Sequence, residues 1–253
     1  MELIEHPPIL HIAAIPDHIL YTWIAMAILV VVSFVASRRV QLVPTGSQNF
    51  MEIVLEQFVK ELDETIGPGG RRYLPLIATL GLFILVSNLM GLVPGLVAPT
   101  ANLNTTAACA LIVFVTYHVI GVRKQGFIAY LKHFAAPPGA PLALAPIMLP
   151  IELISHLSRV MSLSLRLFGN MMAGHILLAI FFFMMGFDGM LGWALRGSVA
   201  GLVIGAPAAL IMVVFVVGFL FPLKILVAFI QTFIFCKLAM LYIAAAVEEA
   251  EHH

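Results

Sequence analysis

Five long apolar runs dominate this sequence and limit what the chain can fold into. A transmembrane helix needs about 20 apolar residues to cross roughly 30 Å of hydrocarbon. Residues 19–37, 73–93 and 102–122 each form such a run without a charged residue. Two further stretches, 141–186 and 197–247, are almost wholly apolar and much longer. Strands of a membrane barrel would show ten-residue segments of alternating polarity, so these continuous runs indicate helices.

The composition agrees with a membrane protein and excludes several other classes. Of the 253 residues, 62% are apolar and 10% are charged, against roughly 25% charged in an ordinary soluble domain. Thirteen Lys and Arg residues balance thirteen Asp and Glu residues, which argues against a nucleic-acid binder built on a basic patch. A chain this apolar is neither disordered nor an ordinary soluble protein. We therefore expect an all-α integral membrane protein, with residues 1–253 forming one membrane domain of about five membrane helices.

The sequence offers no motif for a metal site or an enzyme. Cys109 and Cys236 both lie inside apolar runs, which suggests neither a disulfide framework nor a zinc site. There is no His-Glu-x-x-His, no Gly-x-Ser-x-Gly and no Walker loop, and these are the motifs that would point to hydrolytic or phosphate chemistry. We expect no cofactor, no metal and no catalytic residue, which argues against an intramembrane enzyme.

Each of the two longest stretches is about twice as long as the bilayer core is thick. If helical throughout, each would measure roughly 65–75 Å at 1.5 Å per residue. Each must therefore tilt steeply, break, or form two crossings. Pro207 and Pro222 are plausible kink or break points in the second stretch. The sequence leaves these alternatives open; the architecture we expect is two long tilted helices, 141–186 and 197–247, that form a hairpin.

Residues 47–66 have a different pattern, in which apolar and charged side chains follow a helical spacing. The apolar side chains recur every three or four residues, at Phe50, Ile53, Val54, Phe58, Leu62 and Ile66. Acidic residues and Lys60 occupy most of the other positions. This pattern predicts an amphipathic cytoplasmic helix. It is either an interfacial linker between two spans or, in addition, a docking surface for a partner.

The distribution of Lys and Arg predicts the orientation in the membrane, because cytoplasmic loops carry an excess of both. Residues 38–72 and 123–140 together carry eight, the loop after the fourth run carries Arg196 alone, and residues 1–18 carry none. We therefore expect a periplasmic N-terminus, two cytoplasmic loops and a cytoplasmic tail at 248–253. The N-terminus lacks the basic segment and cleavage site of a signal peptide, which favours a multi-pass protein of a bacterial inner membrane.

Charged and polar side chains gather in the fourth apolar run. Glu152, His156, Arg159, Arg166 and Asn170 follow one another at intervals of 4, 3, 7 and 4, which places all five on one face of an α-helix. A charge inside the bilayer is costly, so such residues are functional candidates. Simpler roles stay open for most of them: pairing near the membrane surface for Glu152 and Arg159, and packing for His156. Arg166 lies deepest in the run and is the hardest to explain structurally.

The last apolar run carries a second set of polar residues. Lys224, Gln231 and Tyr242 are separated by seven and eleven residues, so they project from one helix face. Lys224 either contributes to a polar path or extends toward the outer surface, and Lys237 is expected to extend toward the inner surface. His175, in the fourth run, lies near the opposite side of its helix from the polar stripe and need not share its environment.

One segment closely resembles a known family. The string Ser162-Leu-Ser-Leu-Arg166-Leu-Phe-Gly-Asn170-Met-Met-Ala-Gly-His175 is similar to the signature of subunit a of F-type ATP synthases. The segment Gln231-Thr-Phe-Ile-Phe235, the ending from Tyr242 to the Glu-Glu pair, and Asn88-Leu-Met-Gly-Leu-Val-Pro94 match as well. The order of the helices also matches, and the resemblance covers nearly the whole chain.

This resemblance implies a stator subunit with two offset half-channels. Protons would pass through them to and from carboxylates on the c-ring, coupling proton translocation to rotary ATP synthesis or hydrolysis. Arg166 matches the family's indispensable arginine, which attracts an ionised ring carboxylate and blocks a direct proton leak. The family places ATP chemistry in the peripheral head, so this chain is expected to be a non-catalytic, ion-translocating subunit. The implied partners are the c-ring, the peripheral-stalk b subunits and the lipid bilayer, with no nucleic acid.

The resemblance also assigns roles to other polar residues. Ser162 matches a small polar position beside the arginine, and Asn170 and Gln231 match residues that line the proton path. Glu152 matches an acidic residue associated with proton passage. His175 occupies a position where the family places Glu or His, and a histidine there is suited to relaying protons near neutral pH.

Lys224 departs from the family pattern. Members with His at the position of His175 commonly carry Glu at the position of Lys224, and a lysine cannot act as the carboxylate of that pair. The outer half-channel is therefore expected to use a different set of polar residues from that of those family members. The main alternative function is a secondary transporter or ion channel with intramembrane charges. Such a protein would usually show internal repeats, and none is visible in this sequence.

Overall fold

The computed structural model describes residues 10, 16–38, 41, 46–93, 95–128, 130, 145–186, 189–196, 199 and 201–248. The elements in chain order are α1 (Asp17–Ser37), α2 (Ser47–Thr65), η1 (Pro68–Tyr73), α3 (Leu74–Met90), η2 (Pro99–Ala101), α4 (Leu103–Gln125), α6 (Ala145–Met185), α7 (Met190–Leu195), η4 (Gly201–Gly205), α8 (Ala206–Phe215), η5 (Val216–Leu220) and α9 (Phe221–Glu248). Within the described ranges the regular structure is helical throughout. Five helical segments are long and apolar enough to cross a membrane, which confirms the predicted all-α membrane class.

Several predicted segments lie partly or wholly outside the described residues. These are most of the N-terminal segment 1–18, residues 39–40 and 42–45 of the loop 38–72, Pro94, the greater part of the loop 123–140, residues 141–144 of the fourth run, residues 197, 198 and 200 of the last run, and the tail 249–253. The predicted helix boundaries can be compared elsewhere. α1, α3 and α4 match the predicted runs to within three residues at each end, and α2 ends one residue before the predicted 47–66 segment does.

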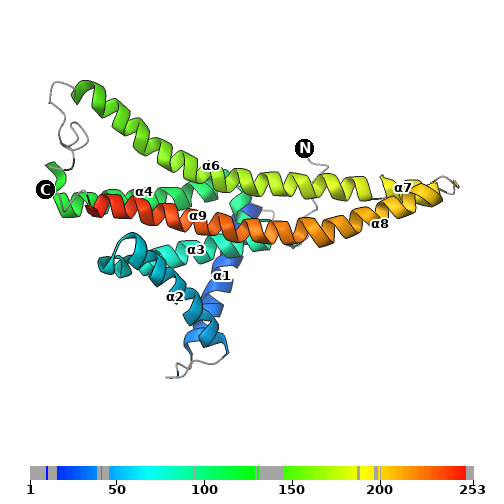
Figure 1. Cartoon of the computed structure of the whole chain (residues 1–253), viewed down its shortest axis with the longest axis horizontal. Coiled ribbons are helices and arrows are strands. Elements are labelled where there is room, and N and C mark those ends of the chain that lie inside the picture. Colours follow the sequence, from blue (N-terminus) through cyan, green and yellow to red (C-terminus); the bar gives the residue numbers. More distant parts are fainter. Residues whose placement is uncertain are drawn as a thin grey trace.

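The long helices form a hairpin that sets the length of the molecule (Figure 1). α6 runs in one direction, and α8, η5 and α9 run back beside it after the short helix α7 at one end. α3 and α4 lie alongside α9, and α4 also packs against α6. α1 crosses the direction of these helices instead of following it (Figure 1). The polar residues of α6 and α9 are therefore held next to α4 along a common length.

The structure decides between tilt and breakage for the two longest runs. α6 is one helix of 41 residues with Pro150 inside it, which corresponds to roughly 60 Å at 1.5 Å per residue. The helix formed by α8, η5 and α9 is also continuous, because the backbone angles are helical at Phe215 (φ −65°, ψ −46°) and at Phe221 (φ −63°, ψ −51°), on either side of η5. Neither helix breaks into two crossings. Such lengths fit a bilayer core of about 30 Å only at a steep tilt, as predicted.

Both prolines of the last run lie just after π-helical turns. η4 spans Gly201–Gly205, with Pro207 near the start of α8, and η5 spans Val216–Leu220, with Pro222 near the start of α9. A proline has no N–H to donate, and its ring collides with the carbonyl four residues earlier in a regular α-helix. A π turn widens the helix at that point. The helix thereby continues past both prolines without a break.

The amphipathic helix α2 docks onto the bundle with only part of its apolar face. Leu62 is completely buried, and Phe58 and Ile66 pack against the same cluster. Phe50 and Ile53, nearer the start of the helix, are 67% and 57% exposed. The simple linker interpretation is therefore incomplete, because the second half of α2 belongs to the packed core.

An ion pair ties α2 to α9. Lys237 Nζ of α9 donates to Glu61 Oε2 at 2.7 Å and to Thr65 Oγ1 at 2.8 Å. The sequence predicted that Lys237 extends toward the inner surface. In the structure its ammonium group reaches two acceptors on α2, 176 and 172 residues away along the chain.

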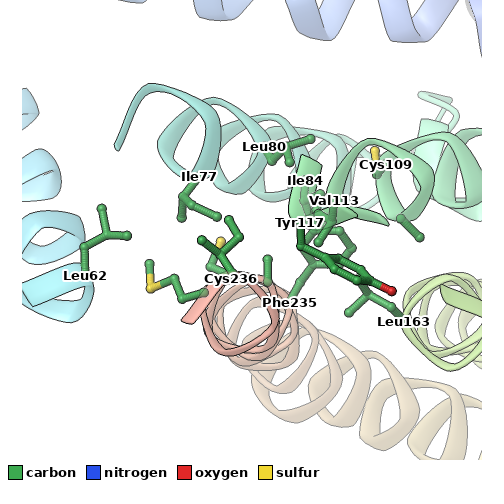
Figure 2. Packing of buried hydrophobic residues seen from close by; sticks show 14 of the residues in the cluster. Leu62, Ile77, Leu80, Ile84, Cys109, Val113, Tyr117, Leu163, Phe235 and Cys236 are labelled. Carbon is green, nitrogen blue, oxygen red and sulfur yellow. The ribbon is translucent and has the colours of Figure 1, made fainter. Parts of the chain in front are cut away.

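The main core lies where α3, α4, α6 and α9 meet, with Leu62 added from α2 (Figure 2). Side chains from all five helices contribute, and fully or almost fully buried examples are Ile77, Ile84, Val113, Leu167 and Phe235. Both cysteines are buried in this cluster as free thiols. The core holds the helices that carry the polar residues in fixed register, so the positions of those residues follow from its packing.

Candidate functional site

Arg166 lies near the midpoint of α6, and its side chain is exposed on the surface of this chain. Its Nη2 donates to Ser162 Oγ at 3.3 Å, one helical turn earlier. No acidic side chain among the described residues forms an ion pair with it. Arginine keeps its charge at any working pH, so a permanent positive charge stands on an apolar helix without an internal counter-charge.

Small side chains surround Arg166 on the same exposed stripe of α6. Ser162, Arg166, Gly169 and Ala173 follow one another at intervals of 4, 3 and 4, and all are exposed. A Cβ atom added to Gly169 would have no neighbouring heavy atom within 4 Å. The small residues at this point therefore leave open space next to the arginine, and none of this chain's described helices fills it.

A hydrogen-bonded group occupies the end of α6 that precedes Arg166. His156 Nε2 lies 3.1 Å from Glu152 Oε1, and His156 Nδ1 lies 2.9 Å from the hydroxyl oxygen of Tyr117 on α4. The i, i+4 spacing of Glu152 and His156 brings their side chains together on the helix surface. His156 is 8% exposed, because Tyr117 and the neighbouring aromatic side chains cover it. These contacts bring together Glu152 and His156, two of the five residues of the predicted polar face.

Aromatic and basic side chains from three helices surround this group. The ring centroid of His118 lies 5.2 Å from that of His156, and the ring of Tyr242 on α9 lies 6.1 Å from that of Tyr117. The guanidinium of Arg159 lies over the Tyr242 ring, 5.7 Å from its centroid. α4, α6 and α9 thus meet at a cluster that contains one carboxylate, two imidazoles, one guanidinium and two phenols.

A second polar group lies beyond Arg166, toward the other end of α6. A Cβ atom added to Gly91 would lie 2.9 Å from His175 Nε2, so the imidazole sits directly against the end of α3. Lys224 lies over Gly174, since a Cβ added there would be 3.0 Å from Lys224 Cε. Lys224 therefore lies over the residue that directly precedes His175 on α6. His175 therefore has surroundings separate from those of Glu152 and His156.

Asn170 and Gln231 are enclosed near the middle of the hairpin. Asn170 Nδ2 is buried and has no hydrogen-bond partner among the residues that the structure describes. Gln231 is 7% exposed and lies on the same buried face of α9 as Ala228 and Phe235. Among the described residues, neither amide is hydrogen-bonded to Arg166. Of the predicted site residues, Ser162 is the one whose side chain bonds to the arginine.

The predicted site residues thus form two groups on either side of Arg166. Fourteen residues separate Arg166 from Glu152 and nine separate it from His175, or roughly 21 Å and 14 Å along the helix axis. No group of three or more His, Cys, Asp or Glu side chains within the described ranges could hold a metal ion. The arrangement offers proton-carrying groups at two places and a fixed cation between them.

Sequence reasoning missed the contribution of α4 to this site. Tyr117 and His118 lie in the third apolar run, and both touch the His156 group. Their polarity inside an apolar run was the available signal, but no spacing rule within one helix could show which other helix they face.

Known proteins of one family are similar to this chain over most of its length. A family model described as "ATP synthase A chain" matches residues 19–244. A protein named "ATP synthase subunit a" from Geobacter sulfurreducens is 47% identical over 242 residues, covering 95% of this chain and 92% of the relative. "ATP synthase subunit a 2" from Syntrophotalea carbinolica is 49% identical over 234 residues, covering 92% of this chain and 87% of the relative. This chain therefore belongs to the ATP synthase subunit a family and is a membrane-sector subunit of that complex.

Proposed function

We propose that this chain is the stator subunit that carries protons between two offset half-channels and the carboxylates of a c-ring. One observation carries the proposal: Arg166 stands exposed at the middle of α6 between two separate polar groups, and no acidic side chain among the described residues pairs with it. Proton flow through the chain is thereby interrupted at a fixed cation. Rotation of a carboxylate past that cation would connect the two sides and couple flow to ATP synthesis or hydrolysis.

Arg166 acts as the electrostatic gate. Its guanidinium attracts an ionised ring carboxylate as it passes and repels a proton that would otherwise cross directly between the half-channels. A lysine could lose its charge in a desolvated site, whereas arginine stays protonated. Ser162 orients the guanidinium through the 3.3 Å hydrogen bond.

The surface around Arg166 suits a closely packed partner helix. Gly169 and Ala173 leave room beside the arginine, and small residues let transmembrane helices approach closely. The missing counter-charge would then come from the partner. Both features point to the c-ring on this face of α6.

The polar groups on either side of Arg166 supply the half-channels. Glu152 belongs to the inner half-channel, and His175 belongs to the outer one. Asn170 and Gln231 line the path near the arginine. Lys224 cannot replace the carboxylate that the family commonly places there. It lies over Gly174, next to His175, and from there it adjusts the charge of the outer entrance.

The remaining assignments concern placement and partners. The chain itself performs no ATP chemistry, which takes place in the peripheral head. We place it in a bacterial inner membrane with the N-terminus periplasmic and the C-terminus cytoplasmic, because Arg38, Arg71, Arg72, Arg123 and Lys124 gather at the cytoplasmic loops. The exposed Phe50 and Ile53 of α2 suit a peripheral-stalk b subunit.

The test is ATP-driven acidification of inverted membrane vesicles that carry Arg166→Ala in the intact complex. We expect pumping to disappear while the complex still assembles, because the ring carboxylate loses its counter-charge and the half-channels lose their barrier. Arg196→Ala is the matched control: it removes an exposed arginine at the end of α7 and should leave pumping intact. Normal coupled pumping in the Arg166 variant would rule out Arg166 as the electrostatic gate, and the proposed function would then be wrong.

A further inference from the structure

We infer that His156, positioned by Tyr117 of α4, carries protons between Glu152 and the membrane interior, so that α4 helps to build the inner half-channel. The inference rests on the proposed function and extends it to two residues outside the polar set that the family resemblance assigned. It places a second proton-carrying group directly beside the acidic residue and adds a third helix to the path.

The geometry around the imidazole is the first support. Both ring nitrogens of His156 are engaged, Nε2 toward Glu152 Oε1 at 3.1 Å and Nδ1 toward Tyr117 Oη at 2.9 Å. A histidine that only filled space would need neither contact. Here the two partners come from different helices and hold the ring with Nε2 directed at the carboxyl group.

The same contacts suit both protonation states of Glu152. When Glu152 is ionised it can only accept, so Nε2–H of His156 donates to it and the Tyr117 hydroxyl donates to Nδ1. When Glu152 is protonated, its O–H donates to Nε2 of the neutral imidazole, and Nδ1–H donates to the Tyr117 oxygen. When that proton has moved to Nε2, Glu152 is ionised, both ring N–H groups donate, and the Tyr117 oxygen still accepts. One proton moves between a carboxyl oxygen and Nε2, only O–H and N–H bonds change, and no other reactant is needed.

The order along the path follows from exposure and helix position. The side chain of Glu152 is 31% exposed and that of His156 is 11% exposed, so Glu152 is the more accessible of the two. His156 lies one helical turn closer to Arg166. A proton released near the arginine therefore meets the imidazole before the carboxylate, and Glu152 passes it to water.

Other charged and titratable groups face this pair and belong to the same electrostatic unit. They are Arg159 on α6, His118 on α4, Tyr130 just after α4 and Tyr242 on α9. The nearby guanidinium of Arg159 disfavours a lasting second positive charge on His156. That favours brief residence of the proton on the imidazole, as a relay requires.

The experiment measures passive proton conductance of the membrane sector. Inverted vesicles are stripped of the catalytic head, a potassium diffusion potential drives protons, and conductance is recorded as a function of pH. His156→Gln keeps a polar side chain but cannot carry a proton. We expect it to lower conductance about tenfold, less than the 10²–10⁴-fold typical of losing a proton-transferring group, because water carries part of the flow. We also expect conductance to depend less steeply on pH than in the parent, because the variant lacks the titratable imidazole.

Three further variants separate a relay from a structural role. Tyr117→Phe should lower conductance less and shift the pH profile, because Nδ1 loses its partner. The exchanged pair Glu152→His/His156→Glu should recover most of the conductance, since it restores one carboxyl and one imidazole at the same spacing. His18→Gln, a histidine on α1, should leave both conductance and pH profile unchanged.

The outcomes distinguish this inference from the proposed function. Wild-type conductance and pH profile in assembled His156→Gln overturn the relay, while loss of pumping in Arg166→Ala would still support the stator. If His156→Gln fails to assemble, Tyr117→Phe decides instead, and an unchanged pH profile there overturns the inference.

Discussion

The effect of a single residue in this protein depends mainly on whether its neighbours provide a charge partner and whether they fill the space around it. Arg166 lacks an acidic partner among the described residues, and Gly169 beside it faces open space. Gly81 of α3 shows the opposite situation. A Cβ atom added there would lie 2.7 Å from Cys236 Sγ and 2.9 Å from Phe58 Cζ. The missing side chain at position 81 is what allows α2, α3 and α9 to meet.

We therefore expect Gly81→Val to destabilise the helix contact by about 1–3 kcal/mol through overpacking. The gain in helix propensity over glycine is at most about 1 kcal/mol and does not offset this cost. The measurement is the temperature at which half of the chain aggregates when the detergent-solubilised complex is heated. Gly69→Val is the control, because a Cβ at that exposed glycine meets nothing within 4 Å. Equal melting of the two variants would show that the contact at Gly81 is loose.

Elements of the fold are joined by a few polar contacts in addition to the apolar core. Two acidic residues of α2 form ion pairs with other elements, and the two pairs differ in how exposed they are. The pair Lys237–Glu61 is partly buried, with side-chain exposures of 34% and 16%, whereas Arg71–Asp63 is exposed, at 66% and 30%. Exposed ion pairs contribute little to stability, while a buried polar group that loses its partner is costly. The two pairs are therefore expected to respond differently to mutation.

Lys237→Met should loosen α2 from the bundle, because Glu61 would keep its charge in a largely enclosed position without the ammonium group. We expect a cost of about 1–3 kcal/mol, measured as faster proteolysis of α2 in inverted vesicles. Glu61→Gln combined with Lys237→Met should recover most of the protection. Asp63→Asn serves as the control and should change little. If Lys237→Met is cut no faster than the parent, the pair does not hold α2.

The exposed pair has a defined pH dependence. The hydrogen bonds from Arg71 lower the pKa of Asp63 below its ordinary value. A carboxyl group with a lowered pKa stabilises the fold at pH above its ordinary value, and that contribution is lost as the pH falls through the lowered pKa. The protease resistance of α2 in the parent chain should thus be insensitive to pH near neutrality, where this contribution is fully present, and weaken slightly in acid.

At the scale of the whole molecule, the hairpin of α6 and α9 is steeply inclined to α1 (Figure 1). Two polar groups lie along the hairpin on either side of Arg166. The basic residues at the end of α1, in η1 and at the end of α4 all belong to the loops that we place in the cytoplasm.

This orientation can be tested by labelling. Gly69→Cys introduces an exposed thiol beside Arg71 and Arg72, whereas the native Cys109 and Cys236 are buried. A membrane-impermeant maleimide should label the variant in inverted vesicles and leave it unlabelled in right-side-out vesicles. The parent chain shows the background. Labelling in right-side-out vesicles would contradict the proposed topology and place residues 38–72 in the periplasm.

The sequence by itself determined the class of protein, the helices and the candidate residues on each helix. Apolar run length specifies a membrane helix, and helical spacing alone places Glu152 and His156 on one face. Both are local properties, so they can be read without knowing the fold. The family motif around Arg166 is local in the same sense.

The tertiary structure decided which helices those faces meet. Tyr117 reaches His156 across 39 residues, and Lys237 reaches Glu61 across 176. Such contacts depend on how several helices pack together, and no periodicity within one helix encodes them. The continuity of the last run was decided in the same way, because its apolar composition did not reveal the π turns before Pro207 and Pro222. Those turns keep η4, α8, η5 and α9 in one continuous helix, and the polar residues of α9 therefore stay in register with α4 and α6.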